Sequence, residues 1–158
     1  MKLPFKPWRS WTAPLHRSMA KKKILTLDTG FDFILIGISS PLKDYRLCWA
    51  INKQCDLKLE REDDLEIWPS GQVASISFSF YTFEDLEDHA TFHVIANKSR
   101  EGWLVAEARE ADYFLMIKGH MPRKSLTALI SNLKAIPNVL TAYEIDPNKL
   151  KSAHNLLI

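Results

Sequence analysis

The sequence predicts an α+β fold: a single antiparallel or mixed β-sheet of about six to eight strands with two helices packed on one face. Two helix-like segments, residues 42–55 and 122–136, lie on either side of the middle of the chain. Between them, short runs rich in β-branched and aromatic residues alternate with turn residues, which is typical of a meander. The expected order is therefore ββαβ, a meander and αβ, in one domain of residues 19–158.

The first strands are expected before residue 40. A short strand is predicted at residues 24–27, and a longer one at residues 31–38, FDFILIGI, is apolar on both faces. Such a run indicates a central strand that is covered on both sides. Ser40 before Pro41 then predicts the N-cap of a helix, with Asp44 in the first turn, where the helix dipole favours an acid.

Residues 42–55 fit a helix or a strand. On the helical interpretation four side chains share one face: Leu42, Tyr45, Cys48 and Trp49. On the strand interpretation the apolar residues alternate from Tyr45 to Ile51. The cap and the length favour the helix. A returning strand is expected at residues 57–60, followed by a charged connection, REDDLE, at residues 61–66.

The second half of the chain has clearer patterns. Residues 73–83, VASISFSFYTF, alternate apolar residues with serine, which predicts a half-exposed antiparallel strand. Further strands are expected at three ranges: 91–96, 103–107 and 112–118. The second helix begins near Pro122, has a stripe at i, i+3, i+4 and i+7 from Leu126 to Leu133, and ends at Ala135-Ile136-Pro137. A last strand is expected at residues 139–146.

Charge is unevenly distributed along the chain. Seven of the 21 Lys and Arg residues precede Ile24, where there is no acid, so that 14 cations and 19 acids remain after it. Residues 1–18 also hold three prolines and two tryptophans, and we expect a disordered basic arm or a spurious extension before a natural start at Met19. A nucleic-acid or membrane partner is expected only if residues 1–18 are functional.

Composition and cysteine usage favour a cytoplasmic location. No stretch approaches the roughly 20 apolar residues of a membrane span, so no transmembrane segment is expected. Cys48 and Cys55, if both lie on one helix, are about 10 Å apart along its axis, which exceeds the reach of a disulfide. Two reduced thiols are typical of the cytoplasm.

Several common activities lack their motifs in this sequence. P-loop, dinucleotide-binding, zinc-protease and serine-hydrolase patterns are missing, and we expect no cofactor, no metal and no catalytic residue. His89 and His93 lie among acids, but on a strand they would be about 13 Å apart, which does not favour a metal site. Asp44 and Arg46 flank Tyr45 and either bind a ligand or form local pairs; the local pairs are favoured.

The strand-to-helix turn at residues 118–124 is the best candidate for a ligand site. Four side chains carry this hypothesis: Lys118, His120, Arg123 and Lys124. Backbone N–H groups at a helix N-terminus, together with nearby cations, favour an anion. The alternative is a solvated loop.

Residues 105–113, VAEAREADY, resemble the motif of the bacterial IPExxxVDY family. The match keeps Glu107, Asp112 and Tyr113 and departs at three positions: Val105, Ala106 and Ala111. Residues 31–52 and 142–158 are also similar to that family. The resemblance implies a small cytoplasmic bacterial protein and points to no particular activity.

The strand, helix, IPNV and strand of the second half are also similar to the second half of ACT-type ferredoxin-like regulatory domains, although the extra meander strands do not fit a plain ACT domain. The leading expectation is a non-enzymatic binding or protein-interaction module with an unknown protein partner. The alternative is an ACT-like regulatory domain that binds a small anionic metabolite near Lys118–Lys124, with a homodimer through an exposed sheet edge as its expected assembly. A third hypothesis is an enzyme whose residues converge only in three dimensions.

Overall fold

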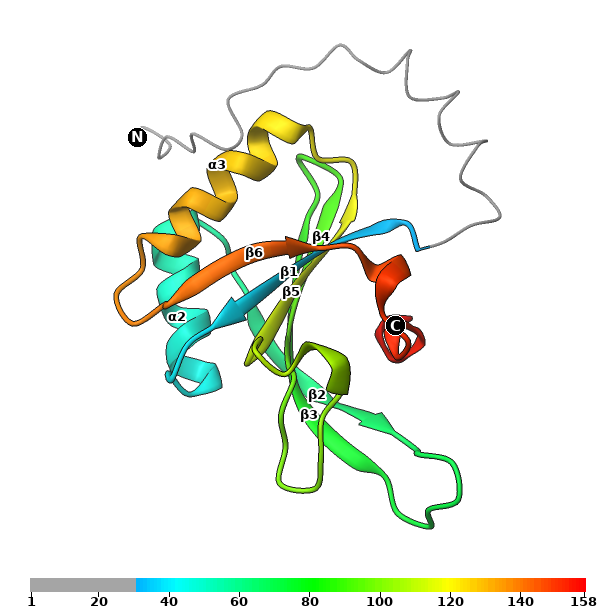
Figure 1. Cartoon of the computed structure of the whole chain (residues 1–158). Helices are drawn as coiled ribbons and strands as arrows, with labels where there is room; N and C mark the ends of the chain where they lie inside the picture. Colours follow the sequence, from blue (N-terminus) through cyan, green and yellow to red (C-terminus); the bar gives the residue numbers. More distant parts are fainter. Residues whose placement is uncertain (1–30) are drawn as a thin grey trace.

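The described part of the chain forms one six-stranded sheet with two α-helices on one face (Figure 1). The computed structural model describes residues 31–158; the strand expected at 24–27 and the segment 1–18 lie outside the described residues. Every pair of neighbouring strands is antiparallel. The predicted α+β class, the single sheet and the two helices on one face are confirmed.

The helices and strands follow one another in the order β1 (Phe33–Ser39), α2 (Asp44–Cys55), β2 (Glu60–Ile67), β3 (Ile76–Asp85), β4 (Ala90–Ala96), β5 (Tyr113–Gly119), α3 (Arg123–Lys134) and β6 (Thr141–Ile145). Three short 3₁₀ helices complete the described residues: η2 (Ala106–Ala108), η3 (Pro147–Lys149) and η4 (Ala153–Leu156). Across the sheet the strands lie in the order β2-β3-β4-β5-β1-β6. None of the helices between residues 31 and 158 has the length and hydrophobicity that a membrane span requires.

Six of the elements form a β-α-β-β-α-β unit. They are β1, α2, β4, β5, α3 and β6, whose strands lie in the order β4-β5-β1-β6. Because β5 and β6 are both antiparallel to β1, α3 connects two strands of the same direction across an intervening strand. Such split connections characterise ferredoxin-like sheets. The β2–β3 hairpin is inserted between α2 and β4 and extends the sheet beyond β4.

The helical layer buries one face of the sheet. Leu47 and Ile51 of α2 and Leu129 and Leu133 of α3 are completely buried. They pack in one cluster with side chains of the central strands, among them Ile36 of β1. Helical spacing places these leucines and isoleucines on the inward side of each helix, and burial of each contributes about 1.5–3 kcal/mol.

The opposite face of the sheet is covered without any α-helix. Leu35 of β1 and Phe114 and Met116 of β5 point to this face and are completely buried. The cover comes from the β4–β5 connection, residues 97–112, and from the C-terminal segment, residues 146–158, which contributes the buried Leu156. The prediction that the first long strand is covered on both faces is therefore confirmed.

Asn97 holds the β4–β5 connection on the sheet. Its side chain is completely buried, and its Nδ2 donates to the carbonyl oxygens of Ala108 and Ala111, both at 2.9 Å. Its Oδ1 accepts from the backbone N of Val105 at 2.7 Å. Ala108 O also accepts from Ala111 N at 3.1 Å, whereas Ala111 O and Val105 N have the Asn97 side chain as their partner. Asn97 thus satisfies backbone groups of an irregular connection that lies on an apolar face.

The helix predicted at residues 42–55 is confirmed, but its predicted start and inward face are wrong. The helix begins at Asp44, and its N-cap is Lys43 rather than Ser40. Ser40 instead forms a turn in which its Oγ accepts from Leu42 N at 3.2 Å. The buried stripe comprises Leu47, Cys48, Ile51 and Cys55. Tyr45 and Trp49, expected on the inward face, are exposed because they lie on the flank of the helix next to this stripe.

Two strand predictions are also wrong. The charged segment 61–66, expected to be a connection, lies within β2. This edge strand pairs only with β3 and leaves its acidic side chains in solvent, so that the charges do not oppose strand formation. Residues 103–107, expected to be a strand, form only an isolated bridge between Trp103 and Lys98, followed by η2. Here the backbone N of Val105 donates to the side chain of Asn97. In a strand this N–H would donate to a neighbouring strand.

Replacing Asn97 by alanine should lower the free energy of unfolding by about 3 kcal/mol, because Val105 N and Ala111 O lose their partner in a buried place and Ala108 O loses one of its two donors. Urea denaturation measures the loss. The exposed Asn148→Ala variant is the control and should change the free energy by less than about 0.5 kcal/mol. A loss below about 1 kcal/mol in Asn97→Ala would show that this side chain does not hold the connection.

Stability should fall as the pH drops from about 6.5 to about 4, because of His93. Burial, and then the charge of Lys118, lower the pKa of His93 from 6.5 to about 4. Between these two pH values the His93 imidazole is protonated in the unfolded chain but neutral in the folded chain, so that acid favours unfolding. Above pH 6.5 the imidazole is neutral in both states. The expected loss is about 2–3 kcal/mol. His93→Gln should flatten this part of the stability curve, whereas His154→Gln, at an exposed site, should leave it unchanged.

Candidate functional site

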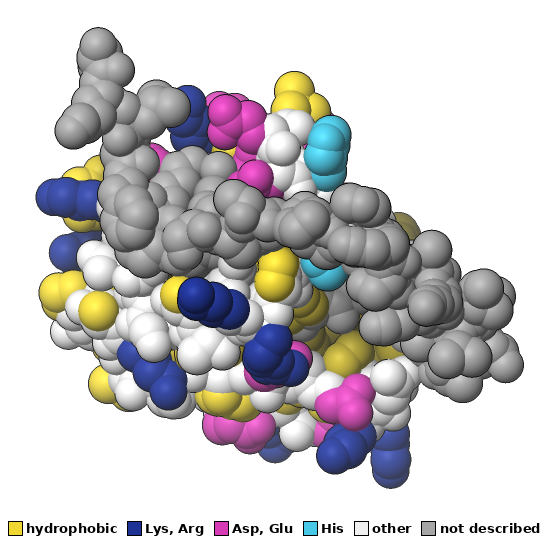
Figure 2. Space-filling model, turned by 90° about the horizontal axis from the view of Figure 1, so that it is seen from above, with side chains coloured by type: hydrophobic (Ala, Val, Ile, Leu, Met, Phe, Trp, Pro, Cys, Tyr) yellow, Lys and Arg dark blue, Asp and Glu magenta, His cyan; other side chains and the backbone are white. Residues whose placement is uncertain are grey.

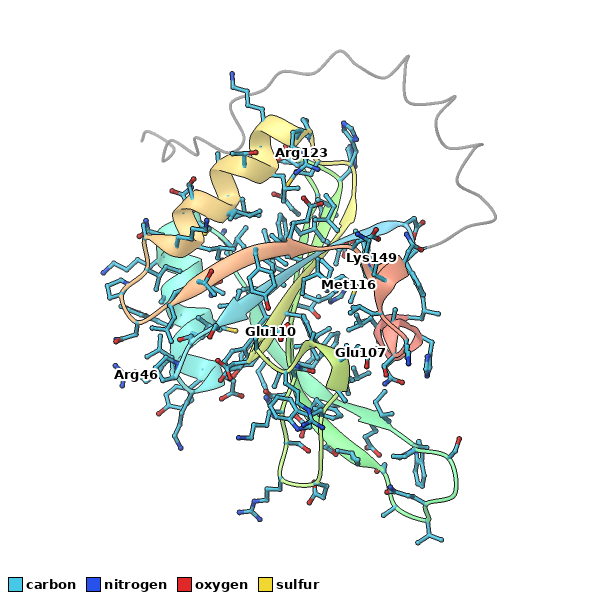
Figure 3. The ribbon with its side chains drawn as sticks, in the orientation of Figure 1. Arg46, Glu107, Glu110, Met116, Arg123 and Lys149 are labelled. Carbon is cyan, nitrogen blue, oxygen red and sulfur yellow. The ribbon has the colours of Figure 1, made fainter. Side chains whose placement is uncertain are left out.

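The turn predicted to bind an anion lies between β5 and α3, and Lys118 and Arg123 contact residues that are distant in the sequence. Lys118 Nζ donates to the main-chain oxygen of Ile158. Arg123 Nη1 lies 2.7 Å from Glu144 Oε1 on β6 (Figure 3). His120 and Lys124 are exposed. On the visible part of the face in Figure 2, the Lys and Arg side chains stand apart rather than gathering into one patch. Anion binding at this turn stays a prediction.

The three residues of the family-like motif act as ties between distant segments. Glu107 accepts from Ser152 N at 2.5 Å and from Ser152 Oγ at 3.1 Å, which connects η2 to the C-terminal segment (Figure 3). Asp112 Oδ2 accepts from Ser40 N at 2.8 Å. Tyr113 donates its hydroxyl to the carbonyl oxygen of Leu42 at 2.7 Å. These contacts give Glu107, Asp112 and Tyr113 a structural role.

The most strongly shifted titratable groups are held in unreactive forms. Burial raises the pKa of both Cys48 and Cys55 to about 12, so that both stay thiols at neutral pH. His93 is buried, stacks on Phe80, and lies with Nδ1 3.0 Å from Thr82 Oγ1. Among residues 31–158, no group of three or more His, Cys, Asp or Glu side chains is placed to hold a metal ion.

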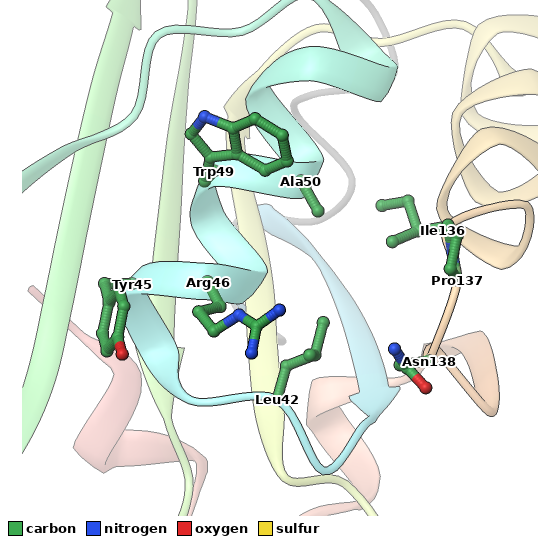
Figure 4. A pocket seen from close by; sticks show the side chains of 8 residues that line it. All are labelled: Leu42, Tyr45, Arg46, Trp49, Ala50, Ile136, Pro137 and Asn138. Carbon is green, nitrogen blue, oxygen red and sulfur yellow. The ribbon is translucent and has the colours of Figure 1, made fainter.

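A groove lies between α2 and the connection from α3 to β6 (Figure 4). It holds about 510 Å³ of water-accessible space, within the range of small-ligand and peptide side-chain pockets. One wall comes from α2 and the turn before it, and the other from the α3–β6 connection. The lining residues are Leu42, Tyr45, Arg46, Trp49, Ala50, Ile136, Pro137 and Asn138.

Two aromatic side chains on one side of this groove are exposed to solvent. Tyr45 is 60% exposed and Trp49 is 64% exposed, one helical turn apart on α2. Helical spacing brings their Cβ atoms to about 5–6 Å, so that the rings form adjacent ridges. The Lys53 ammonium lies 5.0 Å from the centre of the Trp49 ring and restrains the indole by a cation–π contact. Tyr45 and Trp49 therefore expose a large apolar surface to solvent, and the indole of Trp49 is restrained in its orientation.

Arg46 gives the groove its charge. Its guanidinium points into the space between α2 and Asn138 (Figure 4). Among residues 31–158 no carboxylate pairs with it. The neighbouring Asp44 is engaged elsewhere, since Arg61 Nη1 lies 3.1 Å from its Oδ2 and Tyr81 donates to the same oxygen at 3.3 Å. The sequence favours a local pair for Asp44 and Arg46; in the structure Asp44 forms its ion pair with Arg61 instead.

Ser40 joins the two walls of the groove. Its side chain is buried; Oγ donates to the carbonyl oxygen of Asn138 at 2.7 Å and accepts from Leu42 N at 3.2 Å. The backbone N of Ser40 is held in turn by Asp112. Leu140 N also donates to Ser39 O at 2.8 Å. The spacing between the walls is therefore set by hydrogen bonds to one buried turn.

Sequence reasoning considered ligand binding by Asp44 and Arg46 beside Tyr45, but it favoured local pairs and did not include Trp49 in a site. A usable signal was present, because helix α2 has more apolar residues than one stripe can bury. Leu47, Cys48, Ile51 and Cys55 complete an inward stripe, which leaves the two aromatic residues beside it without a place in the core. The contribution of residues 136–138 could not be inferred, since it depends on how the α3–β6 connection packs next to α2.

Replacing Ser40 by alanine should loosen the groove. The Asn138 carbonyl and the Leu42 amide would each lose a partner, and we expect a loss of about 1–2 kcal/mol in the free energy of unfolding. Hydrogen–deuterium exchange should accelerate at Leu42 and at residues 138–140. The exposed Ser131→Ala variant on α3 should leave these rates unchanged. Unaltered exchange in Ser40→Ala would refute the role given to Ser40.

Comparisons of the chain with protein-family models, with curated proteins and with solved structures returned no match. The resemblance to the IPExxxVDY family therefore stays a prediction, and the groove is interpreted from its own geometry.

Proposed function

We propose that this chain is a non-enzymatic protein-interaction module of the cytoplasm that docks a segment of a partner protein in the groove between α2 and the α3–β6 connection. The observation that carries the proposal is the exposure of Tyr45 and Trp49 beside the guanidinium of Arg46. Tyr, Trp and Arg are the residues most enriched at the energetic centres of protein interfaces. Burial of Cys48 and Cys55 as thiols supports the cytoplasmic assignment.

The groove favours a partner segment with both apolar and acidic side chains. Leu42, Ala50 and Ile136 give it apolar walls, and the Trp49 ring offers a flat surface for stacking. A carboxylate can pair with Arg46, which has no acidic partner among the described residues. The expected ligand is therefore a short segment in which an apolar or aromatic residue stands close to Asp or Glu.

A peptide-display selection on the immobilised full chain tests the proposal. Selected peptides should combine an aromatic or aliphatic residue with at least one acid, and Trp49→Ala should weaken their binding at least about tenfold. Leu86→Ala removes an apolar side chain that is 74% exposed on the β3–β4 turn, and it should bind like the original chain.

Two results would contradict the proposal. One is a selection that yields no peptide whose binding depends on Trp49. The other is equal weakening by Trp49→Ala and Leu86→Ala, which would indicate nonspecific adhesion to exposed apolar surface. Circular dichroism and thermal unfolding of each variant establish that the fold is kept.

A further inference from the structure

The charges of the described residues are separated between two parts of the molecule. Helices α2 and α3 carry five Lys or Arg residues and one acid, Asp44. The β2–β3 hairpin, Glu60–Asp85, carries seven Asp or Glu residues and one cation, Arg61. Arg61 is paired with Asp44 and Asp64, so that the hairpin has no free cation of its own. The groove therefore lies beside the basic helices α2 and α3, whereas the acidic residues belong to the projecting β2–β3 hairpin.

The tip of the acidic hairpin is apolar. Trp68 is 65% exposed and Val73 is 96% exposed. Between them the chain turns at residues 69–72, where Gln72 N donates to Pro69 O at 3.2 Å. Gly71 has a positive φ of 78°, which glycine adopts readily. The turn therefore has a defined shape that presents an indole ring, with Glu66 two residues before it.

The hairpin tip has the chemistry that the groove requires. Trp68 supplies an aromatic ring for the surface of Trp49, and Glu66 supplies a carboxylate for Arg46. In Figure 1 the hairpin extends away from α2 and α3, so that the tip does not meet the groove of its own chain. Complementary charge and two exposed apolar surfaces on one molecule favour contact between two molecules.

We infer that the occupant of the groove is the β2–β3 hairpin tip of a second copy of this chain. This inference rests on the proposed function and names its partner. The contact joins two different surfaces, so that each copy carries one groove and one tip. Such contacts either close into a ring, with two copies as the smallest, or extend into a chain of copies.

Sedimentation velocity of the full chain tests the inference. The unaltered chain should associate as its concentration rises, and raising NaCl from about 50 mM to about 500 mM should weaken the association because the charges are exposed. Trp49→Ala breaks the groove and Trp68→Ala breaks the tip; each should associate at least about tenfold more weakly. Leu86→Ala should associate like the unaltered chain.

An equimolar mixture of the two variants gives the decisive result. Trp49→Ala retains an intact tip and Trp68→Ala retains an intact groove, so that the mixture should form heterodimers through one complete contact. Arg46→Glu and Glu66→Lys form a second pair, in which each variant alone should remain monomeric and the mixture should again associate. All four side chains are exposed, and circular dichroism establishes that each variant is folded.

Three outcomes would overturn the inference: an unaltered chain that is monomeric up to about 1 mM, a Trp68→Ala variant that associates normally, or a mixture that behaves like its separate components. If these results came with selected acidic peptides that bind through Trp49, the proposed function would stand and only the identity of the partner would be wrong. Failure of both experiments would remove the groove as a docking surface.

Discussion

The structure depends on the need to cover both faces of its central strands. Side chains of β1 and β5 are completely buried on alternate faces, so that an uncovered face would expose a continuous apolar surface. Helices α2 and α3 cover one face with regular side-chain stripes. The other face is covered by irregular chain, whose backbone groups need partners of their own. Asn97 and Glu107 supply them, the first within the β4–β5 connection and the second toward the C-terminal segment.

The groove is a consequence of how these covers are joined. The turn between β1 and α2 lies next to the connection from α3 to β6, and Ser40 links the two by a hydrogen bond to Asn138. Asp112 holds Ser40 from the β4–β5 connection, and Tyr113 holds Leu42 from β5. Residues of the family-like motif therefore set the position of a surface that they do not line.

The sequence was most informative where a pattern was local. The apolar run of β1 and the leucine stripe of α3 identified their elements, because alternation and helical spacing depend on neighbouring residues only. The charged strand β2 was missed because it is an edge strand that pairs through its backbone while its side chains remain in solvent. The strand wrongly predicted at residues 103–107 has a different cause. The backbone N of Val105 donates to the buried side chain of Asn97, and so it does not pair with a neighbouring strand.

The candidate site was less accessible to prediction than the fold. The turn at Lys118–Lys124 has suitable residue types, but Glu144 and Ile158, both distant in sequence, contact Arg123 and Lys118. Helical spacing identifies Tyr45 and Trp49 as apolar residues of a helix and predicts that they lie on its inward face. Their exposure follows from the stripe of Leu47, Cys48, Ile51 and Cys55, which is sufficient to pack α2 on the sheet.

The most direct test of the groove as the docking surface is intermolecular paramagnetic relaxation enhancement. A spin label attached to a Ser70→Cys variant in unlabelled protein marks the hairpin tip, while Cys48 and Cys55 are buried thiols with a raised pKa. In a mixture with ¹⁵N-labelled protein, the account predicts broadening confined to residues 42–50 and 136–138 of the labelled copies. Broadening centred on another surface, or none at concentrations where the chain associates, would contradict it.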